Sequence, residues 1–273
     1  MEPAHRPPPL VENRYPMTDA QDRCRGVLIG LAAGDLIGGP VRMAVRLAES
    51  LSDLDTFDPA DVFGRYLGWW REGAFDTGPV ADSVLALVAA GVPIRAATER
   101  VHRETGGRTA GCNPAHRAAP LAMSAGIADA DLAACAMAEA GLTHHDPLAG
   151  EVSAAVTTLC RALIRGAEWD RAVQAAGGFG GDIPDDTGGY APEVYRAAVY
   201  FVGTSAGFAE ALERSVGFAG ASNYCPVLAG AIGGARWGAA AVPLTALAHV
   251  GVLLPRVRAV ADALAAGWAA EGC

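Results

Sequence analysis

The sequence contains no lysine, and all 21 basic residues are arginine. The chain therefore cannot form the lysine Schiff base of pyridoxal-phosphate enzymes, and it lacks the lysine of a phosphate-binding P-loop. Aromatic residues are scarce as well, at 7% of the chain. The core must be built mainly from alanine, valine and leucine, and the 34 glycines among 273 residues favour helices packed at short separation.

Other absences exclude whole classes of protein. The net charge is −9 and the arginines form no cluster, so the chain lacks the basic face that binds a nucleic-acid backbone. The six cysteines are scattered, without a CxxC pair or zinc spacing, and indicate reduced thiols in a cytosolic protein. The N-terminus lacks the apolar stretch of a signal peptide, and prolines and an arginine interrupt the most apolar segment, residues 225–254. We expect a cytoplasmic protein without a membrane span.

The composition, with 51% hydrophobic and 19% charged residues, is that of a folded chain. Residues 1–19 are rich in proline and polar side chains, and we expect them to form a flexible tail. No long linker, charge block or repeat interrupts residues 20–273, which are therefore predicted to form a single domain.

Helix signals dominate the pattern. Proline recurs where the first turn of a helix tolerates it, and an apolar segment with helical spacing follows Pro79, Pro147, Pro192 and Pro226. Alternating runs typical of strands are weak. The sequence predicts an all-α fold of about ten to thirteen helices.

Four short loops rich in Gly, Asp, Asn and Thr each precede an apolar helix. They comprise residues 34–40, 75–79, 111–117 and 220–225. Backbone N–H groups at an exposed helix N-terminus can bind phosphate, and ordinary helix capping is the alternative interpretation of each loop.

In this order, the loops resemble the motifs of the ADP-ribosylglycohydrolase family, which includes the dinitrogenase-reductase-activating glycohydrolases. The similar segments are RGVLIGLAAGDLIGGPV, DTGPVADSVLALVAAG, GCNPAHRAAPLA, LTHHDPLAGEV, TGGYAPEVYRAAVYFV and residues 208–238. The resemblance covers about residues 24–243. It implies an orthogonal bundle of many helices, a cleft for ADP-ribose with two divalent metal ions, and cleavage of the glycosidic bond at the ribose anomeric carbon.

The chain departs from the family's pattern at the metal ligands. Ala81 and Asp82 match the two aspartates of the family's Thr-Asp-Asp-Thr motif, so one carboxylate of two remains. Ala221 and Asn223 match the two acids of the C-terminal Gly-Gly-Asp-x-Asp-Thr motif, and Arg42 stands where many members have glutamate.

A pair of Mg²⁺ ions carries about four positive charges and needs several anionic ligands. We therefore expect no paired metal site and no other cofactor. A shifted alignment that recruits Asp76 or residues 185–187 is the alternative. If Arg42 pairs with Asp82, it places a fixed positive charge where a metal ion would lie.

The predicted catalytic residues are Asp82, Asp76 and His116, which carry the carboxylates and the imidazole that acid–base chemistry requires. Helix capping or a local turn is the alternative for each aspartate, and loop bracing is the alternative for His116. The predicted substrate-binding residues are Asp35, Arg42, Ser83, Asn113, Arg117, Tyr190, Asn223 and Tyr224.

Within this set, Arg117 is expected to bind a phosphate in bidentate fashion, and the tyrosines are expected to offer stacking surfaces. His144 and His145 are adjacent in the sequence and are expected to brace the structure. A buried thiol is the expectation for Cys225.

These residues predict an enzyme that acts on a glycosidic bond of ADP-ribose or a related nucleotide, without the family's dinuclear Mg²⁺ site. One alternative is a biosynthetic enzyme on the same scaffold that hydrolyses, eliminates or isomerises a nucleotide-derived metabolite. A second is a non-catalytic protein that binds ADP-ribose or a protein partner. The expected ligand is a small nucleotide-like molecule, and the oligomeric state stays open.

Overall fold

The computed structural model describes residues 20–179, 182–183, 188–220, 222 and 224–268. The helices are α1 (Ala20–Gly34), α2 (Gly39–Leu54), α3 (Pro59–Arg71), α4 (Pro79–Ala89), α5 (Ile94–Glu104), α6 (Asn113–Ala118), α7 (Pro120–Met123), α8 (Asp129–Ala140), α9 (Pro147–Ile164), α10 (Trp169–Ala176), α11 (Ala191–Thr204), α12 (Phe208–Ala219), α13 (Tyr224–Trp237) and α14 (Leu254–Ala266), with the 3-10 helices η1 (Ala239–Ala241) and η2 (Leu244–Leu253).

The all-α prediction is confirmed. Within the described ranges the β pairing amounts to one isolated antiparallel bridge, between Gly111 and Tyr190. Prolines occupy the first turn of the helices that begin at Pro79 and Pro147, as the sequence predicts. The predicted tail, residues 1–19, lies outside the described residues.

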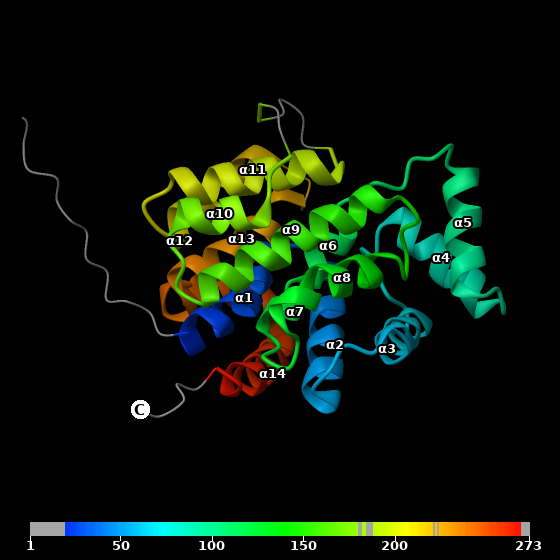
Figure 1. Ribbon diagram of the computed structural model, residues 1–273, viewed down its shortest axis with the longest axis horizontal. Coiled ribbons are helices and arrows are strands. Elements are labelled where there is room, and N and C mark those ends of the chain that lie inside the picture. The colour runs from blue at the N-terminus through cyan, green and yellow to red at the C-terminus, as the bar shows by residue number, and fades with distance from the viewer. Residues whose placement is uncertain (1–19, 180–181, 184–187, 221, 223, 269–273) are drawn as a thin grey trace, which may run out of the picture.

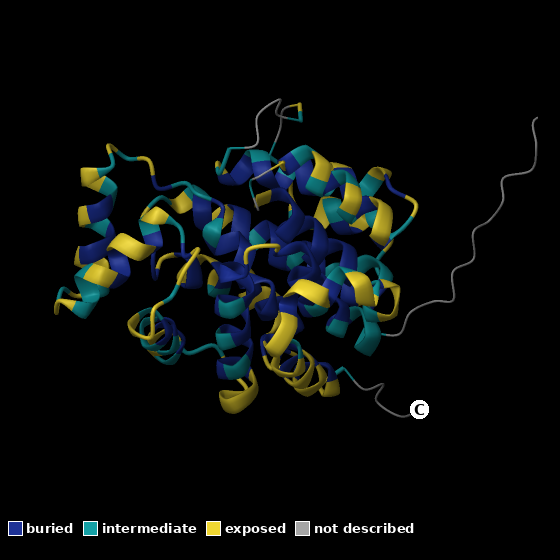
Figure 2. Cartoon of the chain, turned by 180° about the vertical axis from the view of Figure 1, so that it is seen from behind, coloured by how far each residue is buried: buried dark blue, intermediate teal, exposed yellow. Residues whose placement is uncertain are grey.

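The helices pack around a central core (Figure 1). The interior contains α1, α9 and α13, while α10, α11 and α12 cover one side and α2 and α14 the other. Figure 2 shows buried residues concentrated in the middle of the molecule and exposed residues on the outer helix faces. The α4–α5 hairpin projects from one end and has a small apolar cluster of its own, formed by Val84, Ala97 and Val101.

The closest helix contact joins α1 to α13. An added Cβ at Gly26 or Gly30 would lie under 3.0 Å from the backbone oxygen of Gly234 or Gly230, and the reverse holds for Gly230 and Gly234. These four glycines, named here the α1–α13 seam, place backbone directly against backbone. Any side chain at the seam must therefore force the two helices apart.

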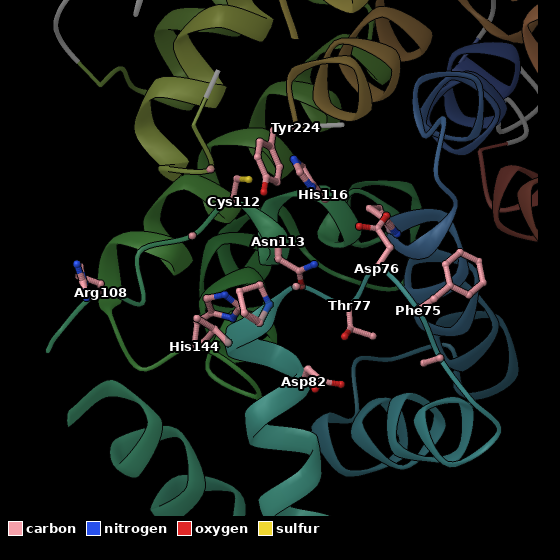
Figure 3. Close-up of a pocket in the computed structure, with 17 residues that line it drawn as sticks. Phe75, Asp76, Thr77, Asp82, Arg108, Cys112, Asn113, His116, His144 and Tyr224 are labelled. Carbon is pink, nitrogen blue, oxygen red and sulfur yellow. The ribbon is translucent and has the colours of Figure 1, made fainter. Parts of the chain in front are cut away.

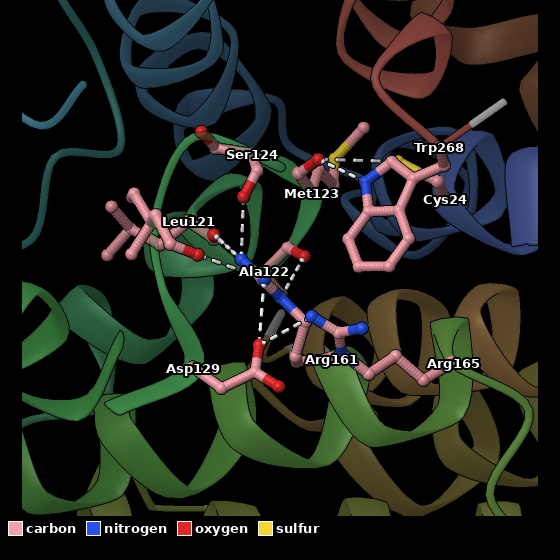
Figure 4. A network of polar contacts seen from close by, with 10 residues as sticks. Cys24, Leu121, Ala122, Met123, Ser124, Asp129, Arg161, Arg165 and Trp268 are labelled. Atoms are coloured by element: carbon pink, nitrogen blue, oxygen red, sulfur yellow. Dashed lines mark hydrogen bonds and ion pairs between the residues drawn. The ribbon is translucent and has the colours of Figure 1, made fainter. Parts of the chain in front are cut away.

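Arg161, on α9, holds α7 and the turn that follows it (Figure 4). Its guanidinium donates hydrogen bonds to the carbonyls of Leu121, Ala122, Ser124 and Ile127 and to the carboxylate of Asp129. The Trp268 ring lies 5.1 Å from the guanidinium carbon. Because Arg161 is only 3% exposed, these bonds replace its lost hydration and fix the α7–α8 segment on α9.

Two helical segments are long and apolar enough to cross a membrane by length and composition alone. They are Pro147–Ile164, which is 67% buried, and Leu244–Ala266, which is 33% buried. A buried core helix meets the same criterion, so these segments are weak support for a span. The expected absence of a membrane span stays a prediction.

Substitution at the seam should destabilise the fold. We expect Gly30→Val to lower the free energy of unfolding by about 1–3 kcal/mol or more, because the new side chain meets backbone that cannot rotate away. Gly64→Ala on α3 is the matched control, since an added Cβ there meets nothing within 4 Å. Urea unfolding followed by circular dichroism measures both changes. A Gly30→Val variant as stable as the Gly64→Ala variant would contradict the close packing.

Candidate functional site

A cavity of about 620 Å³ opens beside the start of α4 (Figure 3). Its lining comes from segments far apart in the sequence, and each of the four glycine- and asparagine-rich loops contributes to it. Pro40 comes from the first loop, Asp76 from the second, Asn113 from the third and Tyr224 from the fourth. Asp82, His116, His144 and Arg108 are among the other lining residues. The structure thus brings two predicted carboxylates and a predicted imidazole to one cavity.

Asp76 occupies a sharp turn before α4 with a φ of 52°. Its Oδ2 accepts a hydrogen bond from the Gly39 N–H at 3.3 Å. Burial and the nearby Asp35 carboxylate raise the pKa of Asp76, and the Gly39 hydrogen bond opposes this shift in part. A carboxyl group with a raised pKa can accept and release a proton nearer neutral pH.

Asp82 lies in the first turn of α4 and reaches the same cavity. Its Oδ1 accepts a hydrogen bond of 2.8 Å from the indole N–H of Trp70 on α3. This bond orients the carboxylate while its second oxygen stays available. Ser83, the neighbouring candidate, is exposed and donates to the Pro79 carbonyl of its own helix, so it does not line the cavity.

His116 and Tyr224 form one wall of the cavity. Their rings stack with centroids 6.1 Å apart and an interplanar angle of 21°. His116 is 3% exposed, and its Nε2 has no hydrogen-bond partner among the described residues. Burial lowers the pKa of His116 to about 4, against an opposing hydrogen bond with the Tyr224 backbone. The imidazole is therefore neutral at pH 7, which argues against the predicted acid–base role of His116.

His144 faces the cavity from the turn before α9, although the sequence analysis assigned it a bracing role. Its Nδ1 lies 2.9 Å from Thr143 Oγ1, which accepts a hydrogen bond from Arg117 Nη2 at 2.8 Å. The contact with Thr143 fixes the orientation of the ring, and Nε2 lies on the side of Gly111 and the cavity. Burial and the Arg117 charge lower the pKa of His144 to about 3.

A sequence profile of the ADP-ribosylglycohydrolase family matches residues 41–272. The chain belongs to the ADP-ribosylglycohydrolase family. A solved structure described as an ADP-ribosylglycohydrolase-related protein complex is similar, with a TM-score of 0.74 and 26% sequence identity. The similarity covers 92% of this chain and 99% of the other. Among proteins of curated function, none matches this sequence significantly.

The Arg117 side chain is fully buried and paired within the protein, which argues against the expected phosphate contact. Its Nε donates to Glu139 Oε1 at 2.6 Å. Nη1 donates to Asn113 Oδ1 at 2.9 Å, and the Tyr66 ring lies 5.0 Å from the guanidinium carbon. Because Arg117 holds Asn113 Oδ1, the amide group of Asn113 keeps its N–H donors for the cavity. Arg117 thus acts through Asn113 and Thr143 as a positioning residue.

Two further candidates have local roles. Asp35 is 1% exposed and accepts hydrogen bonds from the N–H groups of Gly38 and Val41, so it caps α2. Arg42 donates to the Gly38 carbonyl, and its guanidinium carbon lies 4.8 Å from the centroid of the Phe75 ring. Arg42 thus contacts Gly38 and Phe75, and the Asp82 pairing considered in the sequence analysis is not among its contacts in the described residues.

The remaining candidates lie at a second cavity, in the core, or outside the described residues. Tyr190 lines a second, adjoining cavity of about 440 Å³. Cys225 is 2% exposed and its pKa rises with burial, as expected of a structural thiol. Asn223, Ala221 and residues 185–187 lie outside the described residues.

The donor set around the cavity does not suit two Mg²⁺ ions. Two carboxylates line it, Asp76 and Asp82, and each already accepts a hydrogen bond. Ala81, at the first acidic position of the family motif, is fully buried and offers no ligand atom on its side chain. In the described part of the chain, no group of three His, Cys, Asp or Glu side chains is arranged to hold a metal ion. Paired Mg²⁺ ions need more anionic ligands than these.

Loss of the Arg117 guanidinium should destabilise the fold more than it alters a ligand contact. We expect Arg117→Met to lower the free energy of unfolding by about 3–5 kcal/mol, because Glu139 is left buried and unpaired. The double variant Arg117→Met, Glu139→Leu should recover part of this loss. Arg100→Met, which breaks an exposed pair with Glu104, should lose far less. Equal losses in thermal melts of the two single variants would contradict the buried role.

The two cavity histidines should make stability depend on pH. Both folded pKa values lie below the unfolded value near 6.5, so the unfolded chain alone gains protons as the pH falls from 6.5 toward 4. The unfolding free energy should fall by about 1.4 kcal/mol per pH unit for each histidine. His116→Gln should make this fall shallower, while His145→Gln, at an exposed site, should not. Unfolding curves at pH 7.5 and 5 that shift equally in all three proteins would contradict the assignment.

Proposed function

We propose that this chain is a glycoside hydrolase that cleaves the bond at the anomeric carbon of ADP-ribose or a related nucleotide. Membership of the ADP-ribosylglycohydrolase family supports the class of reaction. The observation that carries the proposal is the convergence of Asp76, Asp82 and two neutral histidines on one cavity of about 620 Å³. A glycosidic bond breaks through a positively charged, oxocarbenium-like state, which carboxylates stabilise.

Asp76 is the general base in this proposal. Water attacks the anomeric carbon, Asp76 takes a proton from that water, and the bond to the leaving group breaks with the electron pair going to the leaving atom. The raised pKa of Asp76 suits a group that takes a proton in one step and releases it in the next. The leaving group takes up a proton to complete the hydrolysis.

Asp82 supports the positive charge that develops on the sugar. Its carboxylate is oriented by Trp70 and needs no proton transfer to act in this way. The amide N–H groups of Asn113 and the neutral imidazole of His144 form hydrogen bonds with sugar hydroxyls in this proposal. His116 stays neutral with its low pKa, so we assign it a hydrogen-bonding role in place of the predicted acid–base role.

We also propose that this activity does not require paired Mg²⁺. The support comes from the donor set described above, in which two carboxylates serve where several anionic ligands are needed. A mechanism with two carboxylates and no metal step is consistent with the chemistry of other glycoside hydrolases.

Removal of the Asp76 charge should abolish most of the activity. We expect Asp76→Asn to lower kcat by about 10²–10⁴-fold, since general-base catalysis contributes on that order. Asp131→Asn, at an exposed position on α8, is the matched control. Mass spectrometry of ADP-ribose released from an ADP-ribosylated protein and from a small ADP-riboside measures both. Release by Asp76→Asn at the wild-type rate would overturn the assignment, and no release by the wild type would favour a non-catalytic binding protein.

Metal removal should leave the activity intact. After treatment with EDTA and gel filtration, we expect the release rate and the melting temperature to change little, because no step depends on a bound cation. Addition of Mg²⁺ or Mn²⁺ should give no recovery beyond the untreated protein. Two cations per chain by elemental analysis, or activity that returns only with metal, would contradict the proposal.

A further inference from the structure

Two histidine rings meet where the α4–α5 hairpin contacts the rest of the molecule. His102 lies in the last turn of α5, and His145 lies in the loop before α9. Their ring centroids are 4.8 Å apart, with an interplanar angle of 52°. Neither histidine lines the cavity of Asp76 and Asp82, so the pair is separate from the residues of the proposed reaction.

Both rings have nitrogens available to a ligand. The Nδ1 atom of His102 lies 2.7 Å from Thr109 Oγ1, and its Nε2 forms no hydrogen bond within the described ranges. Nε2 faces Gly107, a residue without a side chain to cover it, and an added Cβ there would lie 3.9 Å away. His145 is exposed, and neither of its ring nitrogens has a hydrogen bond in the part of the chain that the structure describes.

Thr109 can support His102 as a metal ligand. It is fully buried, and its Oγ1 also accepts a hydrogen bond of 3.2 Å from the Asp146 N–H. A metal ion on His102 Nε2 requires the ring hydrogen on Nδ1, and Thr109 Oγ1 can accept that hydrogen. Such a bond fixes the ring orientation of a ligating histidine. Because Asp146 directly follows His145, the same hydroxyl ties together the two segments that carry the histidines.

The separation of the two rings fits a tetrahedral ion. In a zinc site the ion lies about 2 Å from the ligating nitrogen, and therefore about 3 Å from the centre of the imidazole ring. Two rings at a tetrahedral angle around one ion then have centroids about 5 Å apart. The centroids of His102 and His145 are 4.8 Å apart. Since His145 is exposed and makes no hydrogen bond in the described residues, its ring can rotate to direct a nitrogen at the ion.

The Glu99 carboxylate lies close to the pair. It is one turn before His102 on α5, and its charge interacts with that of His145. Arg95 donates to Glu99 Oε1 at 3.0 Å, and the Arg103 charge acts on the same carboxylate, so Glu99 is already paired. Within the described ranges, no group of three His, Cys, Asp or Glu side chains is arranged as a metal site. An ion at the pair would have two protein ligands, with water in its other positions.

We infer that His102 and His145 bind one divalent transition-metal ion that prefers imidazole ligands, such as Zn²⁺, and that this ion clamps the α4–α5 hairpin to the loop before α9. The hairpin has an apolar cluster separate from the main core, so the ion adds a constraint that core packing does not supply. Asp82 lies on this hairpin and His144 precedes His145, so the clamp joins two segments that line the cavity (Figure 1). With two protein ligands the ion is exchangeable, and the proposed hydrolysis does not need it.

Calorimetric titration of the full chain with ZnCl₂, after treatment with EDTA and gel filtration, tests the inference. We expect one Zn²⁺ to bind per chain. His102→Gln and His145→Gln should each weaken this binding about tenfold or more, since each removes one of two protein ligands. Thr109→Val should weaken it about tenfold, because it removes the hydroxyl that orients the His102 ring. His249→Gln is the matched control, since that histidine contacts backbone carbonyls near the end of α1.

Two further measurements locate the ion. The electron paramagnetic resonance spectrum of Cu²⁺ bound to the wild type should show two nitrogen ligands, and His145→Gln should reduce them to one. Saturating Zn²⁺ should slow amide hydrogen exchange in α5 of the wild type, because the ion joins α5 to the loop before α9. The same addition should leave exchange in the His145→Gln protein unchanged.

Three outcomes would overturn the inference. One is Zn²⁺ binding of equal strength in the wild type and in the folded double variant His102→Gln, His145→Gln. Another is the absence of binding to the wild type at millimolar Zn²⁺. The third is binding that His116→Gln abolishes and His102→Gln leaves intact, which would place the ion in the cavity of Asp76. Because every readout is binding, a spectrum or hydrogen exchange, failure of the proposed hydrolysis would leave this inference standing.

Discussion

The α1–α13 seam positions the site because α13 begins at the cavity with Tyr224 and α1 ends directly before the loop whose Pro40 lines the cavity. α1 ends at Gly34, and the next residue, Asp35, caps α2. α13 begins at Tyr224, which stacks on His116. An added Cβ at Gly34 would lie under 3.0 Å from the Pro226 backbone oxygen, so the close contact continues to that end of the pair. The distance between the Asp35 loop and Tyr224 therefore follows from how closely two backbones pack.

Behind the cavity, the buried Arg117 guanidinium orients the neutral side chains of Asn113 and His144. Arg117 pairs with Glu139, whose Oε1 also accepts from the Tyr66 hydroxyl at 2.8 Å. The same guanidinium holds Asn113 and, through Thr143, the ring of His144. Glu139 Oε2 has no partner in the described residues, so the network is not fully satisfied. The energetic cost of this buried charge is consistent with a role in orienting donors at the cavity.

Helix content and the loops of the site follow from local sequence, whereas the roles of the charged side chains do not. Proline at a first turn and apolar residues at helical spacing are local signals, and both mark α4 and α9 correctly. Arg117 misleads because its partner Glu139 lies 22 residues away on another helix, and only the packed fold makes the pair. Arg108, which also lines the cavity, belongs to none of the motifs found in the sequence. The family resemblance marked the loop that contains His144. The orientation of the His144 ring, however, depends on its contact with the Thr143 hydroxyl, which Arg117 holds in place.

The proposed reaction places two opposite electrostatic demands on the cavity. In that reaction positive charge develops on the sugar, which favours carboxylates, while the nucleotide ligand carries negative charge, which carboxylates repel. Separation in space reconciles the two demands. Asp76 and Asp82 lie before and within the first turn of α4, and Arg108 lies beyond His144, where it lines both cavities (Figure 3). His144 and His116 are uncharged at pH 7. Lowered histidine pKa values serve this arrangement, because a charged imidazole beside the sugar would oppose the carboxylates that stabilise its positive charge.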